Sequence, residues 1–222
     1  GTLDADRMIL EPTSGNTGIS LAMVTSRLGF RFTAVMPDNV SPERTELLEA
    51  YGAEIIYSPG DQGSNGSIAA AKALADQDPS YLMLFQYGNE ANPGAHYATT
   101  GPEIIRDIPE VTHFVAGLGT GGTLMGTGRR LKEFNPKVQI IAAAPEPDDR
   151  IQGLRDLEEG FVPPILDLAM LDARIMVSGE ESFRRTAELL RREGVFAGVS
   201  SGAVLAAAMA FSITSLGTGV SA

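Results

Sequence analysis

The stretch MILEPTSGNTGISLAMVTSRLGFRFTAVM, residues 8–36, decides the fold class of this chain. It begins with an apolar run that is typical of a strand end and passes through a turn rich in hydroxyl groups. A helical pattern follows over residues 17–28, and a second apolar run covers residues 32–36. Both apolar runs are continuous rather than alternating, as expected for strands covered on both faces. This order predicts two parallel strands joined by a crossover helix.

The same alternation continues along the chain. Ser41-Pro42-Glu43 predicts a helix start with a serine cap, and Gly52 predicts its end. Further strands are expected over residues 54–57, 82–85, 112–118, 138–144 and 174–177. Helices are expected over residues 67–76, 93–108 (interrupted before Pro102), 122–134 and 180–192. We therefore predict an α/β fold of parallel sheets with helices on both faces, and a long loop of functional interest over residues 146–171.

Composition excludes several classes of function. The 222 residues carry 28 acidic and 17 basic side chains, a formal charge of −11, so nucleic acid and anionic membranes are unsuitable partners. The chain has no cysteine, which excludes disulfides, thiolate metal sites and a cysteine nucleophile, and its two histidines argue against a multi-histidine metal centre, so no metal site is predicted. No signal peptide is recognisable at the start. Residues 194–222 lack charges, but serines, threonines and glycines interrupt them, which favours a buried helix and a loose tail over a membrane span.

Two loops between a strand and a helix carry candidate chemistry. Residues 13–18, Thr-Ser-Gly-Asn-Thr-Gly, offer hydroxyls and an amide at a helix N-terminus, a donor set that suits a carboxylate or a phosphate. The alternative is an ordinary capped turn, because the same residue types are favoured there.

Residues 119–123, Gly-Thr-Gly-Gly-Thr, form the second loop, in which glycines let the main chain approach an anion such as a phosphate. A glycine-rich turn without a ligand is the alternative. Gly117, Gly119 and Gly122 also fit a dinucleotide-binding pattern with Glu146 as the ribose acid, a weak match that leaves residues 13–18 unexplained.

The ordered motifs EPTSGNTG (residues 11–18), MPDN (36–39), QYGN (86–89), TGPE (100–103), GTGGT (119–123) and SSGA (200–203) resemble the pyridoxal-phosphate-dependent cysteine synthases of the β-family, fold type II. The B-type branch, which includes O-phosphoserine-dependent enzymes, is the most similar. The resemblance implies the tryptophan-synthase-β-like fold with two subdomains, both incomplete. Residues 1–92 would form the mobile substrate-loop subdomain, and residues 93–222 the subdomain that binds the cofactor phosphate.

The resemblance also implies site residues. The substrate would be bound by Thr13, Ser14, Gly15, Asn16, Thr17, Gln86 and Arg155, the last of which would read a substrate phosphate unless it is a solvated loop arginine. Pyridoxal 5'-phosphate would be bound by Asn16, Gly119, Thr120, Gly121, Gly122, Thr123 and Gly153. The reaction would be β-replacement of O-acetylserine or O-phosphoserine by a sulfur donor, in a cytoplasmic enzyme that is a homodimer at full length.

The sequence departs from the family in two places. The family's Schiff-base lysine precedes the Thr-Ser-Gly-Asn loop, but none of the twelve residues before Thr13 is lysine. Lys72, Lys132 and Lys137 lack the family context and are expected to be surface charges. The family pattern also ends soon after Met209, before the strand whose side chain meets the pyridine nitrogen. We therefore expect a chain truncated at both ends, without a catalytic residue and inactive alone.

Other functions remain open from sequence. Another β-family enzyme, such as a dehydratase or a cystathionine β-synthase-like protein, is the nearest alternative. A nicotinamide-dependent oxidoreductase would use Glu146, and a non-catalytic protein would keep the anion-binding loops without turnover. His96 and His113 are expected to be structural.

Overall fold

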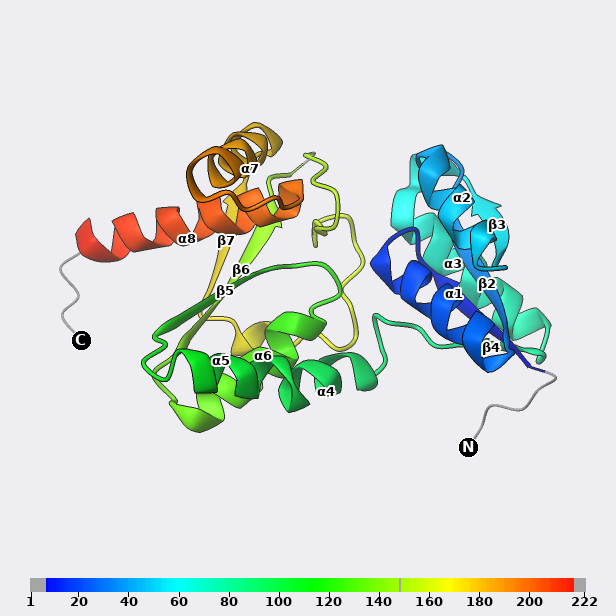
Figure 1. The fold of residues 1–222 in the computed structure, drawn as a ribbon, viewed down its shortest axis with the longest axis horizontal. Helices are drawn as coiled ribbons and strands as arrows, with labels where there is room; N and C mark the ends of the chain where they lie inside the picture. The colour runs from blue at the N-terminus through cyan, green and yellow to red at the C-terminus, as the bar shows by residue number, and fades with distance from the viewer. Residues whose placement is uncertain (1–6, 148, 218–222) are drawn as a thin grey trace. The chain divides into compact units, whose positions relative to one another are not determined.

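The computed structural model describes residues 7–147 and 149–217, with the backbone alone for residues 213–217. The chain divides into two compact units, Gly1–Gln86 and Tyr87–Ala222 (Figure 1). We predicted a functional boundary after residue 92, and that assignment stays a prediction. No helix among the described residues is long and apolar enough to cross a membrane.

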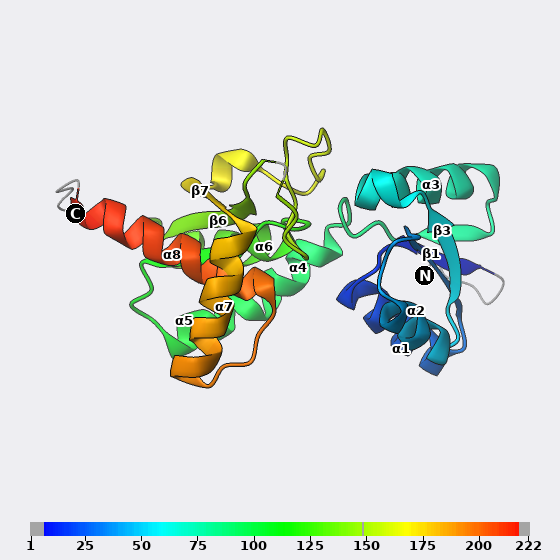
Figure 2. The ribbon, with the colours of Figure 1, turned by 90° about the horizontal axis from the view of Figure 1, so that it is seen from above.

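The first unit is built on a parallel four-stranded sheet in the order β3-β2-β1-β4. Its strands are β1 (Met8–Pro12), β2 (Arg31–Pro37), β3 (Glu54–Ser58) and β4 (Tyr81–Met83). Helices α1 (Asn16–Leu28) and α2 (Pro42–Ala50) lie on one face, and α3 (Gly63–Gln77), which follows the short 3-10 turn η1 (Gly60–Gln62), lies on the other (Figure 2).

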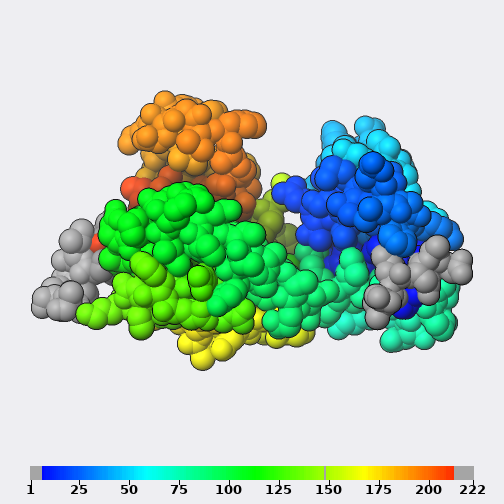
Figure 3. All heavy atoms as spheres, turned by 60° about the horizontal axis from the view of Figure 1, so that its bottom comes forward, coloured from blue at the N-terminus to red at the C-terminus, as the bar shows by residue number. Residues whose placement is uncertain are grey.

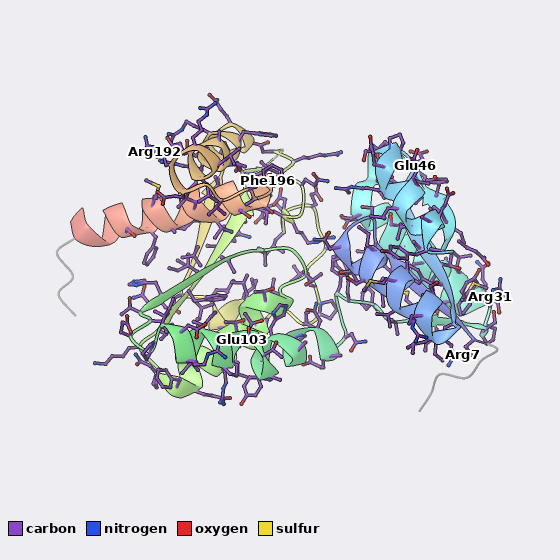
Figure 4. The ribbon with its side chains drawn as sticks, viewed as in Figure 1. Arg7, Arg31, Glu46, Glu103, Arg192 and Phe196 are labelled. Atoms are coloured by element: carbon purple, nitrogen blue, oxygen red, sulfur yellow. The ribbon has the colours of Figure 1, made fainter. Side chains whose placement is uncertain are left out.

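Alternation along β1 explains how both faces of this sheet are covered. Ile9 packs with Ala22 of α1 and Leu48 of α2, whereas the next residue, Leu10, packs with Ala71 of α3. Successive side chains of a strand point to opposite faces, so a strand between two helical layers must be apolar at every position. At the rim of the unit, Arg31 points outward and pairs with Glu54 at 2.7 Å (Figure 4).

The second unit holds a parallel three-stranded sheet in the order β5-β6-β7. Its strands are β5 (His113–Gly117), β6 (Gln139–Pro145) and β7 (Ala173–Val177). Helices α4 (Ala91–Ala98), α5 (Thr100–Asp107) and α6 (Gly122–Phe134) lie on one face. Helices α7 (Gly179–Glu193) and α8 (Val199–Gly217) lie on the other, and α7 stands out at the surface (Figure 3). A 3-10 turn, η2 (Leu168–Met170), precedes β7.

The predicted α/β class with parallel strands between helices is confirmed. Some details differ from the prediction. The strand expected over residues 82–85 ends at Met83, because Phe85 adopts a left-handed φ of 55°. Helix α3 begins at Gly63, four residues before the expected start. Ser41 occupies the N-cap of α2 without a capping hydrogen bond from its side chain. The predicted interruption of the helix before Pro102 is confirmed, and it lies at Thr99, whose backbone leaves the helical region.

Candidate functional site

The first candidate loop joins β1 to α1 in the first unit. The Thr13 N–H donates to the Val35 carbonyl oxygen at 2.9 Å, which fixes the start of the loop to β2. The Thr13 hydroxyl accepts from the N–H groups of Gly18 and Gly15 at 3.2 and 3.4 Å. A Cβ on Gly18 would lie 2.8 Å from Thr13 Cγ2, so the closed loop requires glycine there. The buried Thr13 side chain thus shapes the loop from inside.

The outer part of this loop presents donors to an anion. Asn16 is exposed, and Ser14 and Thr17 are partly exposed. Gly15 is the N-cap of α1 and, as a glycine, has no side chain that could accept a capping hydrogen bond. Within the described residues, the N–H groups of Asn16 and Thr17 have no acceptor. Arg44 brings its guanidinium to 3.5 Å from the Ser14 hydroxyl. Free N–H groups, the positive helix end and this cation together suit a carboxylate.

Gln86, the other predicted carboxylate contact, lies against the same loop. Its Oε1 accepts the Thr17 hydroxyl at 2.8 Å, and its Nε2 donates to the Pro12 carbonyl at 3.3 Å. The structure therefore brings Gln86 into contact with the loop at residues 13–17, although Thr17 and Gln86 are 69 positions apart in the sequence. Sequence alone could place them together only through the family resemblance.

Glu11 was missed as a site residue. Its side chain is fully buried at the end of β1, and its carboxylate accepts the N–H groups of Phe85 at 2.7 Å and Gln86 at 2.9 Å. Burial raises the pKa of Glu11 from 4.5 to about 7, while hydrogen bonds from Gln86 and Phe85 oppose that rise. An acid directly after a buried apolar run was the available signal, because such a carboxylate needs specific partners.

The second loop joins β5 to α6 in the second unit, and its glycines are required by space and by backbone conformation. A Cβ on Gly122 would lie 1.9 Å from Asn92 Oδ1, and one on Gly119 would lie 3.0 Å from the Gly153 carbonyl oxygen. Gly121 has a φ of 91° and caps α6 without a side-chain hydrogen bond. In the part of the chain that the structure describes, the N–H groups of Gly119, Thr120 and Gly121 have no acceptor. This geometry suits a phosphate, and we call residues 119–123 the cradle.

Two side chains of α4 hold the threonines of this cradle. Asn92 donates to the Thr120 hydroxyl at 3.0 Å, and His96 Nε2 lies 3.1 Å from the Thr123 hydroxyl. His96 Nδ1 lies 3.1 Å from the Thr100 hydroxyl, so the ring bridges two threonines. Burial lowers the pKa of His96, which favours the neutral ring. The expected structural role of His96 fits these contacts, although sequence reasoning missed that they reach the cradle.

The segment 151–155 lies along the same cradle. The Arg155 N–H donates to the Leu118 carbonyl at 2.7 Å, and Gly153, with a φ of 91°, places its carbonyl beside Gly119. Arg155 is only 6% exposed, and its guanidinium lies 5.0 Å from the Tyr87 ring centroid and 4.9 Å from the Phe161 ring centroid. The alternative of a solvated loop arginine is therefore wrong.

Comparison with known proteins identifies the family of this chain. The family model described as "Pyridoxal-phosphate dependent enzyme" matches residues 3–219. The chain belongs to this family. Its cofactor is pyridoxal phosphate, and the cradle at residues 119–123 fits the phosphate of that cofactor, because it combines close main-chain approach with free N–H groups at a helix N-terminus. Nothing in this family match favours the dinucleotide interpretation of Glu146.

Relatives of this pyridoxal-phosphate enzyme are named cysteine synthases. The chain is 43% identical over 220 residues to a probable cysteine synthase of Bacillus subtilis (strain 168), with 94% of this chain and 71% of that protein covered. It is 42% identical over 208 residues to a cysteine synthase of Aquifex aeolicus (strain VF5), with 92% and 64% covered. The chain therefore spans roughly two thirds of the length of these relatives.

Solved structures confirm the fold. A crystal structure of O-ureido-L-serine synthase is 38% identical with a TM-score of 0.84 and covers 92% of this chain, which in turn spans 67% of that structure. The O-acetyl serine sulfhydrylase isoform 3 of Entamoeba histolytica is 32% identical with a TM-score of 0.82, over 91% of this chain and 63% of its own. The predicted fold of the pyridoxal-phosphate-dependent cysteine synthases is confirmed.

The three lysines of the chain are Lys72, Lys132 and Lys137, and none of them belongs to either loop. Lys132 pairs with Asp172 at 2.8 Å at the end of α6. Lys137 is exposed, and Lys72 on α3 is exposed with its ammonium 4.8 Å from the Phe85 ring centroid. His113 is also exposed and contacts its neighbour Thr112 at 2.8 Å. Lys132 and His113 thus contact residues outside both loops.

Proposed function

We propose that this chain carries the substrate-carboxylate loop and the cofactor-phosphate cradle of a cysteine synthase, which makes cysteine by β-replacement of O-acetylserine or O-phosphoserine with a sulfur donor. The single observation that carries the proposal is the first loop, in which the Gln86 side chain bonds to Thr17 beside the free N–H groups of α1. The cysteine synthases among the relatives support the reaction class.

The two loops would bind different groups, one the substrate carboxylate and the other the cofactor phosphate. Ser14, Asn16 and Thr17 would hold the α-carboxylate of an amino acid through N–H and hydroxyl donors, with Gln86 as a second amide contact. Residues 119–123 would hold the cofactor phosphate. Pyridoxal phosphate, when bound, supplies the electron sink that stabilises a carbanion at the α-carbon of an amino acid. A carboxylate fixed by several donors sets the orientation of the α-carbon hydrogen and of the β-leaving group.

Arg155 is the proposed specificity residue for a phosphate leaving group. A guanidinium offers a forked set of donors that matches phosphate oxygens, and its charge is permanent. Two aromatic rings hold the Arg155 guanidinium in place, which reduces the conformational entropy lost when a phosphate binds. This arrangement favours O-phosphoserine over O-acetylserine as the substrate.

The chain by itself is proposed not to turn over. A lysine that anchors the cofactor and moves the α-proton is needed, and the three lysines here lie outside both loops. The homodimer and the cytoplasmic location stay predictions.

Cofactor binding is the first test. Equilibrium dialysis of pyridoxal phosphate against the wild-type chain should show one site, and Gly122→Ala should weaken it at least tenfold because the new Cβ collides with Asn92. Gly94→Ala, in a helix with open space around the glycine, is the matched control and should bind as the wild type does. Borohydride reduction should leave no stoichiometric adduct on Lys72, Lys132 or Lys137. A single adduct at one of them would contradict the absence of the catalytic lysine.

Substrate selectivity separates this function from its alternatives. The cofactor-loaded chain should bind O-phospho-L-serine more tightly than O-acetyl-L-serine, and Arg155→Lys should reduce that preference. Preference for L-serine or L-threonine would favour a dehydratase instead. Absence of binding by all four amino acids would favour a non-catalytic role, and formation of cysteine from O-acetyl-L-serine and sulfide by this chain alone would refute the proposed inactivity.

A further inference from the structure

Glu11 joins two segments of the first unit that are far apart in the sequence. Both of its carboxylate oxygens are used, since Oε2 accepts the Phe85 N–H at 2.7 Å and Oε1 accepts the Gln86 N–H at 2.9 Å. The side chain is fully buried, in a chain where other carboxylates are mostly exposed. A buried carboxylate with two short main-chain partners fixes the peptide groups that it contacts.

The segment that Glu11 holds has an unfavourable backbone conformation. Phe85 has a φ of 55°, the one positive φ of a non-glycine residue among the described residues. A bulky residue reaches this region only where the surroundings impose it. The two N–H groups that flank this strained position are the two that Glu11 binds, so the carboxylate stabilises the strained turn directly.

This turn determines where the Gln86 side chain lies. The Gln86 main chain is fixed by Glu11, and its amide then reaches the Thr17 hydroxyl at 2.8 Å and the Pro12 carbonyl at 3.3 Å. If Phe85 relaxed to an ordinary backbone conformation, the Gln86 side chain would leave in another direction. The carboxylate loop would then lose its amide contact.

We propose that Glu11 is a positioning residue for the substrate-carboxylate site, which holds the turn at Phe85 and Gln86 so that the Gln86 amide faces the loop at residues 13–17. The inference rests on the proposed function for the identity of the ligand, an amino acid carboxylate. Glutamine at position 11 would preserve the shape but not the role, because its NH2 group would face an N–H donor. Leucine would remove both acceptors.

NMR spectroscopy of the complete 15N-labelled chain tests this role. In Glu11→Gln, the side-chain NH2 signals of Gln86 and the amide signals of Phe85 should move, while the amides of β2 stay in place. We follow titration with O-acetyl-L-serine at the amides of residues 14–17. The dissociation constant should be at least tenfold larger in Glu11→Gln than in the wild type, and Glu11→Leu should show no measurable binding. Glu54→Gln, which removes an exposed carboxylate of the same unit, should bind as the wild type does.

Two outcomes separate the positioning role from the proposed function. If wild-type residues 14–17 do not respond to O-acetyl-L-serine but the Gln86 signals respond to Glu11→Gln, the ligand proposal fails and the positioning of Gln86 stands. If Glu11→Gln binds the amino acid as tightly as the wild type, the positioning role is refuted.

Hydrogen exchange in the wild type covers the case in which the variants do not fold. The amides of Phe85 and Gln86 should be protected at least a thousandfold although they lie beyond the end of β4, and exchange at the rate of a free peptide would overturn the proposal.

Discussion

Glu11 makes a quantitative prediction about how the stability of the first unit depends on pH. Its pKa is about 7 in the folded chain and 4.5 in its ordinary state, because burial disfavours the charged form. The folded state therefore binds more protons than the unfolded state between these two values, so stability is fully present below pH 4.5 and is lost as pH rises through 7. At about 1.4 kcal/mol per pH unit, the rise from 4.5 to about 7 corresponds to a loss of about 3 kcal/mol.

The assay is urea unfolding at pH 5 and pH 8.5, followed at NMR resonances of β2, which report on the first unit alone. Between pH 5 and pH 8.5, the wild type should lose most of the about 3 kcal/mol that the raised pKa of Glu11 contributes to the free energy of unfolding. Glu11→Gln cannot ionise at this position, so its free energy of unfolding should change much less. Glu54→Gln keeps Glu11 and should retain the wild-type slope.

The comparison between variants is what can refute the reasoning. Other carboxylates of an acidic chain also titrate, but they are shared by the wild type and Glu11→Gln and cancel in the difference. If the two proteins lose the same free energy of unfolding between pH 5 and pH 8.5, Glu11 does not carry the raised pKa. The buried carboxylate would then be as well solvated by its two N–H partners as it is in water.

Three further predictions concern the second unit. The pKa of the His96 ring, measured by NMR, should lie below its ordinary value of 6.5. Because the pKa is lowered in the folded state, the free energy of unfolding of this unit should fall as pH falls through 6.5. His96→Gln should remove this pH dependence. Gly202→Ala should destabilise the unit by roughly 1–3 kcal/mol in urea unfolding, since its Cβ would lie 2.0 Å from the Ser182 carbonyl oxygen, whereas Gly198→Ala meets open space and should cost less than about 1 kcal/mol. Lys132→Ala should cost at most about 1 kcal/mol, because the Lys132–Asp172 pair is partly exposed, and 0.5 M NaCl should reduce that cost.

Helices and strands were predictable where the apolar pattern agrees with the residues that mark the start or end of an element. Helix α6 spans Gly122–Phe134 as predicted, because a glycine loop precedes it and an apolar face runs through it to Leu131. The parallel strands were predictable from their continuous apolar runs, which follow from helical layers on both faces. The end of β4 was not predictable, because it depends on Phe85, whose backbone is held by a glutamate 74 positions away.

The candidate site was predictable in its loops and not in what supports them. Residues 13–17 and 119–123 carry local signals, since glycine and hydroxyl residues between a strand and a helix form anion sites from main-chain atoms. Asn92 and His96 carry no such signal, since an amide or an imidazole in a helix is ordinary until the fold places it against a threonine. Likewise, the sequence around Arg155 is acidic, and only the fold shows the two aromatic rings that bury it.

Both loops need side chains from outside the loop to fix their conformation, and the physical reason is the same for each. A loop that binds an anion through main-chain N–H groups must leave those groups without internal acceptors, so it lacks the hydrogen bonds that make other turns rigid. Rigidity must then come from side chains behind the loop. In the first unit Glu11 and Gln86 supply it through Thr17, and in the second unit α4 supplies it through two threonines. Substitution of Glu11, Asn92 or His96 should therefore change ligand affinity, although these three side chains support the loops and are not proposed to touch the ligand.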